Sequence, residues 1–243
     1  MDMSLLKQAI SIYPENFERI LLLAFTILLP FLLFHGAISN YVFYLVADTP
    51  AQFYGDFSNL YLMMIFYLFV QIPFIQLTKS DQEGEEAVVK KSYISFLKYS
   101  SSVFLFGVVF ITSVLLGMVL FIIPGIIILL FFYFTPYVAV YNERSVWKSM
   151  KTAFQVAKKN VMKLICLLLV IALIEGVLSS LLMQVVSLFS LNYFVILFPQ
   201  LLLNMMLLPL FVIFTSLCYD KWAKDLYSTR LQNSNAFVGI ESK

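Results

Sequence analysis

Three polar side chains lie deep within long apolar stretches of this sequence, where chemistry inside a membrane would need them. Glu175 lies in the stretch VIALIEGVL, His35 is the only histidine of the chain, and Asn204 lies among leucines and methionines. A carboxylate in such a setting is costly and is by default a functional candidate. Together the three side chains could relay a proton or hold the polar headgroup of a substrate.

Each of these residues also has a purely structural interpretation. A protonated Glu175 could be hydrogen-bonded to a neighbouring helix, or water could reach it near a helix end. Gly176, Ser179 and Ser180 beside it permit the close helix contacts that favour packing. His35, followed by Gly36, could equally lie at the outer membrane interface.

The sequence lacks the usual motifs of soluble enzymes. It contains no G-x-x-x-x-G-K-[ST], H-E-x-x-H or G-x-S-x-G pattern, and one histidine cannot build a histidine-rich metal site. No second acid or nucleophile stands convincingly beside Glu175. We therefore expect no enzyme activity, no cofactor, no metal ion and no nucleic-acid partner.

The amino-acid composition indicates a protein that resides in a lipid membrane rather than in water. Of its 243 residues, 61% are hydrophobic and 12% are charged, whereas ordinary soluble domains carry about 25% charged residues. A soluble core cannot hide this much apolar surface. We expect a single integral membrane domain over residues 1–243, whose first apolar run is too long for a signal peptide and is an uncleaved span.

Six apolar stretches predict an all-α, polytopic protein of six transmembrane helices arranged as three hairpins. Most of them approach or exceed the roughly 20 residues that a spanning helix needs. The predicted spans cover residues 20–46, 57–77, 101–123, 126–141, 161–187 and 193–219. Glu175 lies twelve residues after Lys163, about 18 Å along its helix and near mid-membrane.

The basic residues predict the orientation of these spans. If the six spans alternate, all 16 Lys and Arg side chains fall on one side of the membrane. The positive-inside rule then places both termini in the cytoplasm. Because Lys98 and Arg144 flank one long uncharged run, that run must cross twice, and we expect its turn at Pro124 and Gly125.

A weak internal repeat supports three hairpins. Pro73, Pro136 and Pro209 each lie late in an even-numbered span. After the first two comes an amphipathic segment with the pattern Val-x-Lys-Ser, at Val89–Ser92 and Val146–Ser149. The earlier of these segments opens with a capping-box pattern at Ser80–Glu83.

The later segment predicts a helix with one apolar stripe, formed by Trp147, Met150, Phe154, Ala157 and Val161, with Ser145 as its N-cap. Such a helix would lie in the headgroup plane, or pack against the cytoplasmic face of the protein itself, or both. In the first case its lysines would contact anionic lipid headgroups. These lysines are Lys148, Lys151, Lys158 and Lys159.

The stretch FIIPGIIILLFFYFTPYVAVYNERSVWKSMKTAFQVAKKNVMK, residues 121–163, resembles the YciC-like family of uncharacterised bacterial inner-membrane proteins. That family is similar to the membrane domain of some glycerophosphodiester phosphodiesterases. The clearest match covers residues 96–170, and the start ENFERILLLAF is also similar. The resemblance implies six helices in a bacterial plasma membrane. It implies no catalytic residues, because the soluble phosphodiesterase domain has no counterpart here.

Two functions remain open, with a third disfavoured. The hairpins, the proline-containing spans and Glu175 favour a module that binds or transports a lipid or hydrophobic solute. The basic amphipathic segments favour a non-catalytic factor for envelope homeostasis, assembly or immunity, with a membrane-protein partner not yet identified. An intramembrane enzyme would need a second catalytic group near Glu175.

Overall fold

The computed structural model describes residues 3–189 and 192–241, which are helical and contain no strand. The elements are α1 (Met3–Glu15), α2 (Phe17–Leu23), the π-helical η1 (Ala24–Leu28), α3 (Leu29–Val46), α4 (Gln52–Val70), α5 (Ile72–Gln82), α6 (Val88–Leu120), α7 (Ile122–Phe132), α8 (Thr135–Tyr141), α9 (Val146–Lys159), α10 (Val161–Ser187) and α11 (Tyr193–Glu241).

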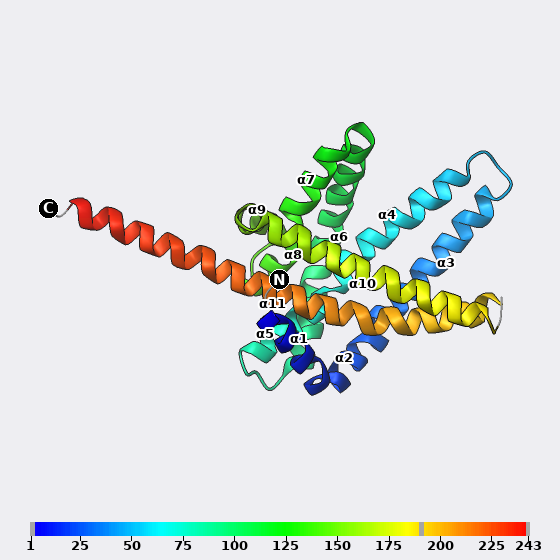
Figure 1. Ribbon diagram of the computed structural model, residues 1–243, viewed down its shortest axis with the longest axis horizontal. Helices are drawn as coiled ribbons and strands as arrows, with labels where there is room; N and C mark the ends of the chain where they lie inside the picture. Colours follow the sequence, from blue (N-terminus) through cyan, green and yellow to red (C-terminus); the bar gives the residue numbers. More distant parts are fainter. Residues whose placement is uncertain (1–2, 190–191, 242–243) are drawn as a thin grey trace.

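Six helical stretches of the described residues are long and apolar enough to cross a membrane. They are Phe17–Val46, Gln52–Gln82, Val88–Leu120, Ile122–Tyr141, Val161–Ser187 and Val195–Thr229. These bounds contain or closely match the six spans expected from the sequence. The helices pair as hairpins α3–α4, α6–α7 and α10–α11, which diverge from a common centre (Figure 1).

The core lies where the three hairpins converge. It is built from the segments that follow Pro73, Pro136 and Pro209: residues 72–80, 135–140 and 211–219 are buried without exception. The aromatic rings of Tyr137 and Tyr219, whose centroids are 6.2 Å apart, join the second and third of these segments. The core is therefore one bundle of three post-proline segments, one from each hairpin.

Prolines break two of the three even-numbered spans and leave the third continuous. Pro73 and Pro136 lie in the first turns of α5 and α8, where a missing N–H leaves no helical hydrogen bond unmade. Pro209 lies inside the continuous α11, and the Tyr13 hydroxyl of α1 donates to the carbonyl of Met206 at 3.0 Å. The helix α1 thus packs on α11 near this proline, a contact that the sequence did not reveal.

The hairpin turn between α6 and α7 lies at Phe121, three residues before the expected position. Phe121 has an extended backbone (φ −154°, ψ 124°), while Pro124 and Gly125 already belong to the first turn of α7. Proline is suited to a first turn for the reason given above for Pro73. The proline and glycine therefore begin the returning helix rather than form the reversal.

Gly125 serves a close contact between the two helices of this hairpin. A Cβ atom on Gly125 would lie 2.6 Å from the backbone nitrogen of Met118 and 2.7 Å from the carbonyl oxygen of Val114. A Cβ atom on Gly117, across the contact, would lie 2.9 Å from the Cα of Gly125. The pair lets the backbones of α6 and α7 approach as small residues do in membrane proteins.

The buried face of α9 differs from the expected stripe. Val146, Ser149, Ala153, Val156 and Ala157 are buried, whereas the Trp147 side chain is 50% exposed. Ala153 and Ala157 let α9 pack closely on α7 and α8, and Phe154 of the expected stripe also packs on α7, with its ring centroid 4.8 Å from that of Phe131. Ser145 occupies the N-cap position, without a capping hydrogen bond from its side chain.

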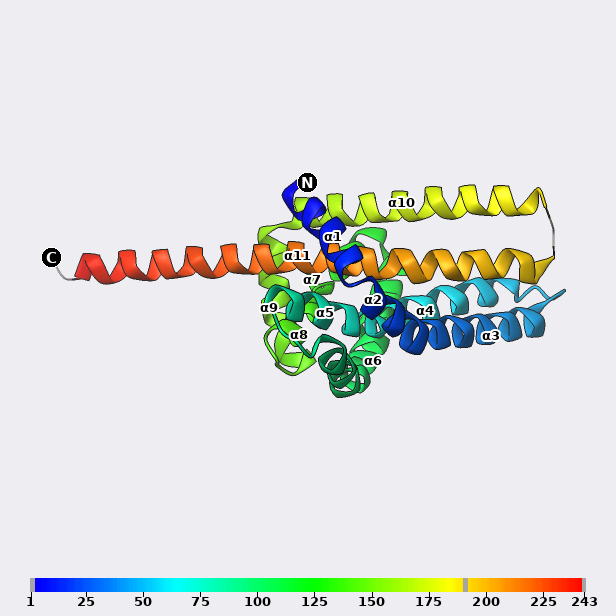
Figure 2. The same cartoon turned by 90° about the horizontal axis from the view of Figure 1, so that it is seen from below.

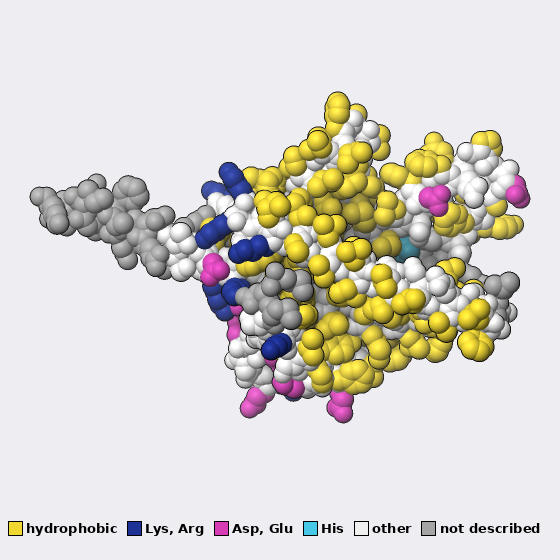
Figure 3. Space-filling model, viewed as in Figure 1, with side chains coloured by type: hydrophobic (Ala, Val, Ile, Leu, Met, Phe, Trp, Pro, Cys, Tyr) yellow, Lys and Arg dark blue, Asp and Glu magenta, His cyan; other side chains and the backbone are white. Residues whose placement is uncertain are grey.

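The earlier basic segment is not a separate interfacial helix. Residues 80–82 end α5, and α6 runs without a break from Val88 into the membrane span. The expected capping box at Ser80–Glu83 is therefore wrong, because those residues end one helix instead of starting another. Lys and Arg side chains gather at the end of the molecule that holds α9 and the start of α6, which we call the basic end (Figure 3). On the face shown there, none lies near the tips of α3–α4 and α10–α11.

Replacing Gly125 by alanine should destabilise the protein by ~1–3 kcal/mol, because the added methyl group meets backbone atoms that cannot move aside. The matched control is Gly36→Ala, whose new methyl group would meet nothing within 4 Å. Alanine favours a helix over glycine by roughly 1 kcal/mol, so the control should not lower the melting temperature. Thermal unfolding of both variants in detergent checks this, and equal melting temperatures would contradict the tight contact.

Candidate functional site

A cavity of about 140 Å³ lies between the hairpins α3–α4 and α10–α11. Its walls are mostly apolar side chains from η1, α3, α4 and α11, among them Phe31, Phe66 and Phe211. A single water needs ~10–15 Å³ on this measure, so the cavity has room for several waters or for part of a small ligand. His35, Tyr67, Glu175 and Asn204 supply its polar groups.

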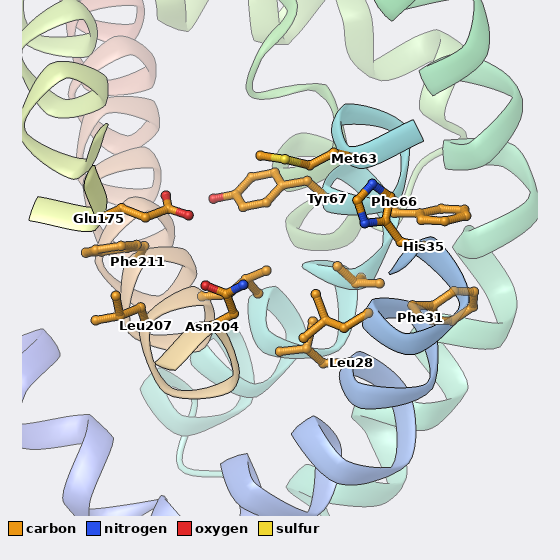
Figure 4. Close-up of a pocket in the computed structure, with 13 residues that line it drawn as sticks. Leu28, Phe31, His35, Met63, Phe66, Tyr67, Glu175, Asn204, Leu207 and Phe211 are labelled. Atoms are coloured by element: carbon orange, nitrogen blue, oxygen red, sulfur yellow. The ribbon is translucent and has the colours of Figure 1, made fainter. Parts of the chain in front are cut away.

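Glu175 is the only side chain that α10 contributes to this cavity. It is half-buried, and its carboxylate points across the cavity toward the hydroxyl of Tyr67 on α4 (Figure 4). The two groups interact electrostatically, and no hydrogen bond from another described residue holds the carboxylate. The carboxyl group is therefore available to a ligand in the cavity.

His35 lies on the opposite wall, where neighbouring groups fix its ring. Its Nε2 is 3.3 Å from the carbonyl oxygen of Asn59 and 3.3 Å from Oγ of Ser39. The ring also packs edge-on against Phe66, with centroids 6.1 Å apart. One ring nitrogen thus has partners within the α3–α4 hairpin.

Asn204 belongs to a polar contact between α10 and α11. Nε2 of Gln200 donates to Oδ1 of Asn204 at 3.4 Å and to Oγ of Ser179 at 3.1 Å. This contact ties the two helices together one to two turns from the cavity. Ser179 thus joins α10 to α11 through a hydrogen bond, whereas a Cβ atom on Gly176 would meet nothing within 4 Å, so the close helix contact expected at Gly176 is absent.

The structure brings all three residues selected from the sequence to the walls of one cavity. They do not form one hydrogen-bonded cluster, because the partners of His35 and Asn204 lie within their own hairpins. Glu175 and Asn204 come from the third hairpin, and His35 comes from the first. Any joint action of these groups must therefore pass through a molecule that occupies the cavity.

Sequence reasoning missed a buried cluster of tyrosines in the core. The rings of Tyr133 and Tyr137 stack with their centroids 6.0 Å apart, and the Tyr137 hydroxyl donates to Oε1 of Gln71 at 2.9 Å. Tyrosine is common both at membrane interfaces and in cores, so its type alone does not indicate burial. The available signal was the closeness of these tyrosines and Gln71 to Pro73 and Pro136.

No family model, curated protein or solved structure matches this chain. The resemblance to the YciC-like family therefore remains an expectation, and the cavity is interpreted from its geometry alone.

The described residues contain no group of three or more His, Cys, Asp or Glu side chains that could hold a metal ion. What the cavity offers instead is an apolar enclosure with a carboxyl group, an amide and an imidazole at separate points on its wall. Such a lining suits an amphiphilic ligand, whose polar end hydrogen-bonds while its apolar part meets aromatic rings.

The lysines proposed to contact headgroups lie on α9 at the basic end of the molecule. Lys148, Lys151, Lys158 and Lys159 are all exposed. Lys159 is nevertheless engaged within the protein, because its Nζ donates to the carbonyl oxygen of Asp225 and to Oγ1 of Thr229, each at 3.0 Å. The first three remain the better candidates for lipid contact.

Removing the Tyr137 hydroxyl should leave Oε1 of Gln71 without its partner in the core. We expect Tyr137→Phe to destabilise the protein by roughly 1 kcal/mol, a typical value for a hydrogen bond between membrane helices. Gln71→Leu should cost a similar amount, and the double variant should cost less than the sum of the two. A double-mutant cycle from unfolding in mixed micelles measures this coupling, with the exposed Tyr44→Phe as control. Strictly additive costs would contradict the importance of this bond.

Proposed function

We propose that this chain is a multi-pass protein of a bacterial plasma membrane that binds or transports a lipid or hydrophobic solute. The observation that carries the proposal is the cavity itself. The one acidic residue deep within the apolar spans, Glu175, and the one histidine of the chain, His35, come from different hairpins and face the same apolar enclosure. Polar groups buried at such depth mark substrate pathways in membrane proteins.

The position of the cavity supports entry from the lipid phase. The hairpins diverge away from the core, and large apolar side chains such as Leu173 and Val177 cover their outer surfaces. In the space-filling view the histidine is visible from outside in a recess between apolar surfaces (Figure 3). A membrane-dissolved ligand would therefore reach the cavity sideways, without crossing water.

In this proposal each polar group has a defined task. The Glu175 carboxyl group and the Asn204 amide hold the polar end of the ligand, and the aromatic rings of α3 and α4 pack against its apolar part. His35 adds a hydrogen-bonding group on the far wall. We assign no reaction to this chain, because Glu175 is the only acid that lines the cavity.

A second candidate is a non-catalytic factor that acts through protein or lipid contacts. The observation that favours it is the long α11, which extends well beyond the bundle (Figures 1 and 2). A projecting helix beside the exposed lysines of α9 is suited to a partner at the basic end. Crosslinking from native membranes would recover such a partner at a fixed ratio, whereas clean monomer would count against this function.

Filling the cavity should prevent ligand capture. We expect Leu207→Trp to reduce photo-crosslinking of a phospholipid with a diazirine-bearing acyl chain by about tenfold, because the indole occupies the enclosure. Leu202→Trp is the matched control, since Leu202 lies on the same helix, is 40% exposed and does not line the cavity. Equal crosslinking in both tryptophan variants, mapped by mass spectrometry, would refute binding at this cavity.

The proposed orientation places Phe121 outside the cell, with both termini in the cytoplasm. In a background without Cys166 and Cys218, a single Phe121→Cys should react with a membrane-impermeant thiol reagent in intact cells. Lys148→Cys, at the basic end, should react only after the cells are opened. The reverse pattern would invert the orientation.

A further inference from the structure

A second cavity, of about 210 Å³, lies at the basic end of the molecule. It is bounded by α5, by the first three turns of α6 and by the turn between α8 and α9. No residue that lines the Glu175 cavity also lines this one. It is therefore a separate site, and the proposed function makes no use of it.

Two hydroxyl groups on the wall of this cavity are buried without a hydrogen-bond partner. Ser95 is 5% exposed and Tyr99 is 6% exposed, and neither Oγ nor Oη has a partner in the part of the chain that the structure describes. Oε2 of Glu85 is a third buried atom without a partner, but as a carboxylate oxygen it cannot donate to an anion. Buried polar groups in native proteins are almost always paired, so two unpartnered hydroxyls beside one cavity point to a polar ligand.

The charges around the cavity leave one lysine free. Nζ of Lys79 donates to Glu143 at 2.9 Å, and Lys91 pairs with Glu85. These hydrogen bonds lower the pKa of both carboxyl groups from their usual value, so both are ionised at neutral pH and balance the two lysines.

Lys98 forms no salt bridge with a carboxylate among the described residues, although it attracts Glu143 electrostatically, and it lies over the ring of Tyr99, with Nζ 5.0 Å from the centroid. Three lysines and two glutamates thus leave a single positive charge beside two hydroxyl donors. A phosphodiester carries one negative charge and offers several acceptor oxygens, so it complements this arrangement.

The turn at Glu143 is consistent with a site that is held in place. Glu143 adopts a left-handed backbone (φ 51°), which is uncommon for a residue other than glycine. This conformation directs its carboxylate to the nearly buried Lys79. Strained backbone of this kind persists where surrounding contacts hold it, which is common at ligand sites.

Exposed apolar side chains adjoin the cavity on α6. Ile94 lines it and is 52% exposed, and Leu97 on the next turn is 74% exposed. Shortly afterwards α6 enters the apolar part of its span. A phosphate held by Lys98 would therefore sit at headgroup level, with apolar surface below it for acyl chains.

We propose that this cavity binds a phosphate group at the membrane interface, through the Lys98 ammonium and the hydroxyls of Ser95 and Tyr99. The shared chemistry is that of a phosphate ester, which a phospholipid headgroup or a soluble phosphate could present. The apolar surface of Ile94 and Leu97 favours the lipid.

The test measures binding of phosphatidylglycerol to the purified full chain in detergent by native mass spectrometry. Ser95→Ala combined with Tyr99→Phe changes no charge and should weaken binding by about tenfold, as should Lys98→Gln. Lys90→Gln is the control, because it removes an exposed lysine of the same helix, α6, that does not line the cavity. This control should alter binding less than twofold. Diacylglycerol, which lacks the phosphate, should not bind at this site.

We also expect the Ser95→Ala, Tyr99→Phe double variant to fold normally. Removing hydroxyls that lack partners should maintain or raise the melting temperature in the absence of lipid. A second arm uses inorganic phosphate as competitor: displacement of the lipid would assign the site to soluble phosphates, and no displacement would assign it to lipid. Unchanged lipid affinity in the double variant would overturn the proposal and leave the hydroxyls as groups paired with water alone.

Discussion

The hydrogen bond from Tyr137 to Gln71 is the contact on which the architecture depends. A broken helix inside a membrane exposes backbone groups that no lipid can satisfy, so a break survives only where protein covers it. Here the spans Gln52–Gln82 and Ile122–Tyr141 both break, and Tyr137 after one break donates to Gln71 within the other. Gln71 in turn donates to the carbonyl of Leu68 at the end of α4. Gln71 thus satisfies a carbonyl at its own break, and Tyr137 holds Gln71 in place from the other broken span.

The divergence of the hairpins follows from this arrangement. The three post-proline segments pack together at the basic end, and the outer helices have no comparable common core to hold them together. Only 17% of the most apolar window of α10 is buried, against 67% for the span that contains α4 and α5. The space where the hairpins separate is bounded by apolar side chains and by the few polar ones at that depth. The cavity with Glu175 is therefore a product of the same breaks that build the core.

The six helical spans could be predicted because hydropathy and length decide them. The hairpin α6–α7 could be predicted too, because an uncharged run twice the membrane thickness must turn back. Its turn was misplaced because proline and glycine were assigned to the reversal, although proline is equally suited to a first helical turn and Gly125 is needed for contact with Gly117. The buried face of α9 was misjudged in part, since small residues such as Ala153 are fully buried whereas Trp147 of the expected stripe lies at the edge.

Depth along each helix could also be predicted, and it placed Glu175, His35 and Asn204 at comparable levels. Long-range packing decides which hairpins are neighbours, and the local sequence pattern does not show this. The shared cavity could therefore not be predicted. The phosphate site shows the same limit. Its lysines were visible as charge, but the pairing that leaves Lys98 free depends on Glu143, which follows Lys79 by 64 residues.

The two cavities lie on either side of one break. Val70 lines the first cavity and Gln76 lines the second, so six residues separate them, about 9 Å along the helix axis. Gln71 lies between them and is fixed by Tyr137. Communication between two sites needs an element with two arrangements that each ligand favours differently. The break at Gln71 is the only interruption between these two lining residues, because α4 ends at Val70 and α5 begins at Ile72. A shift of one half of this span relative to the other would therefore occur at the break, where the Tyr137–Gln71 contact holds the present arrangement.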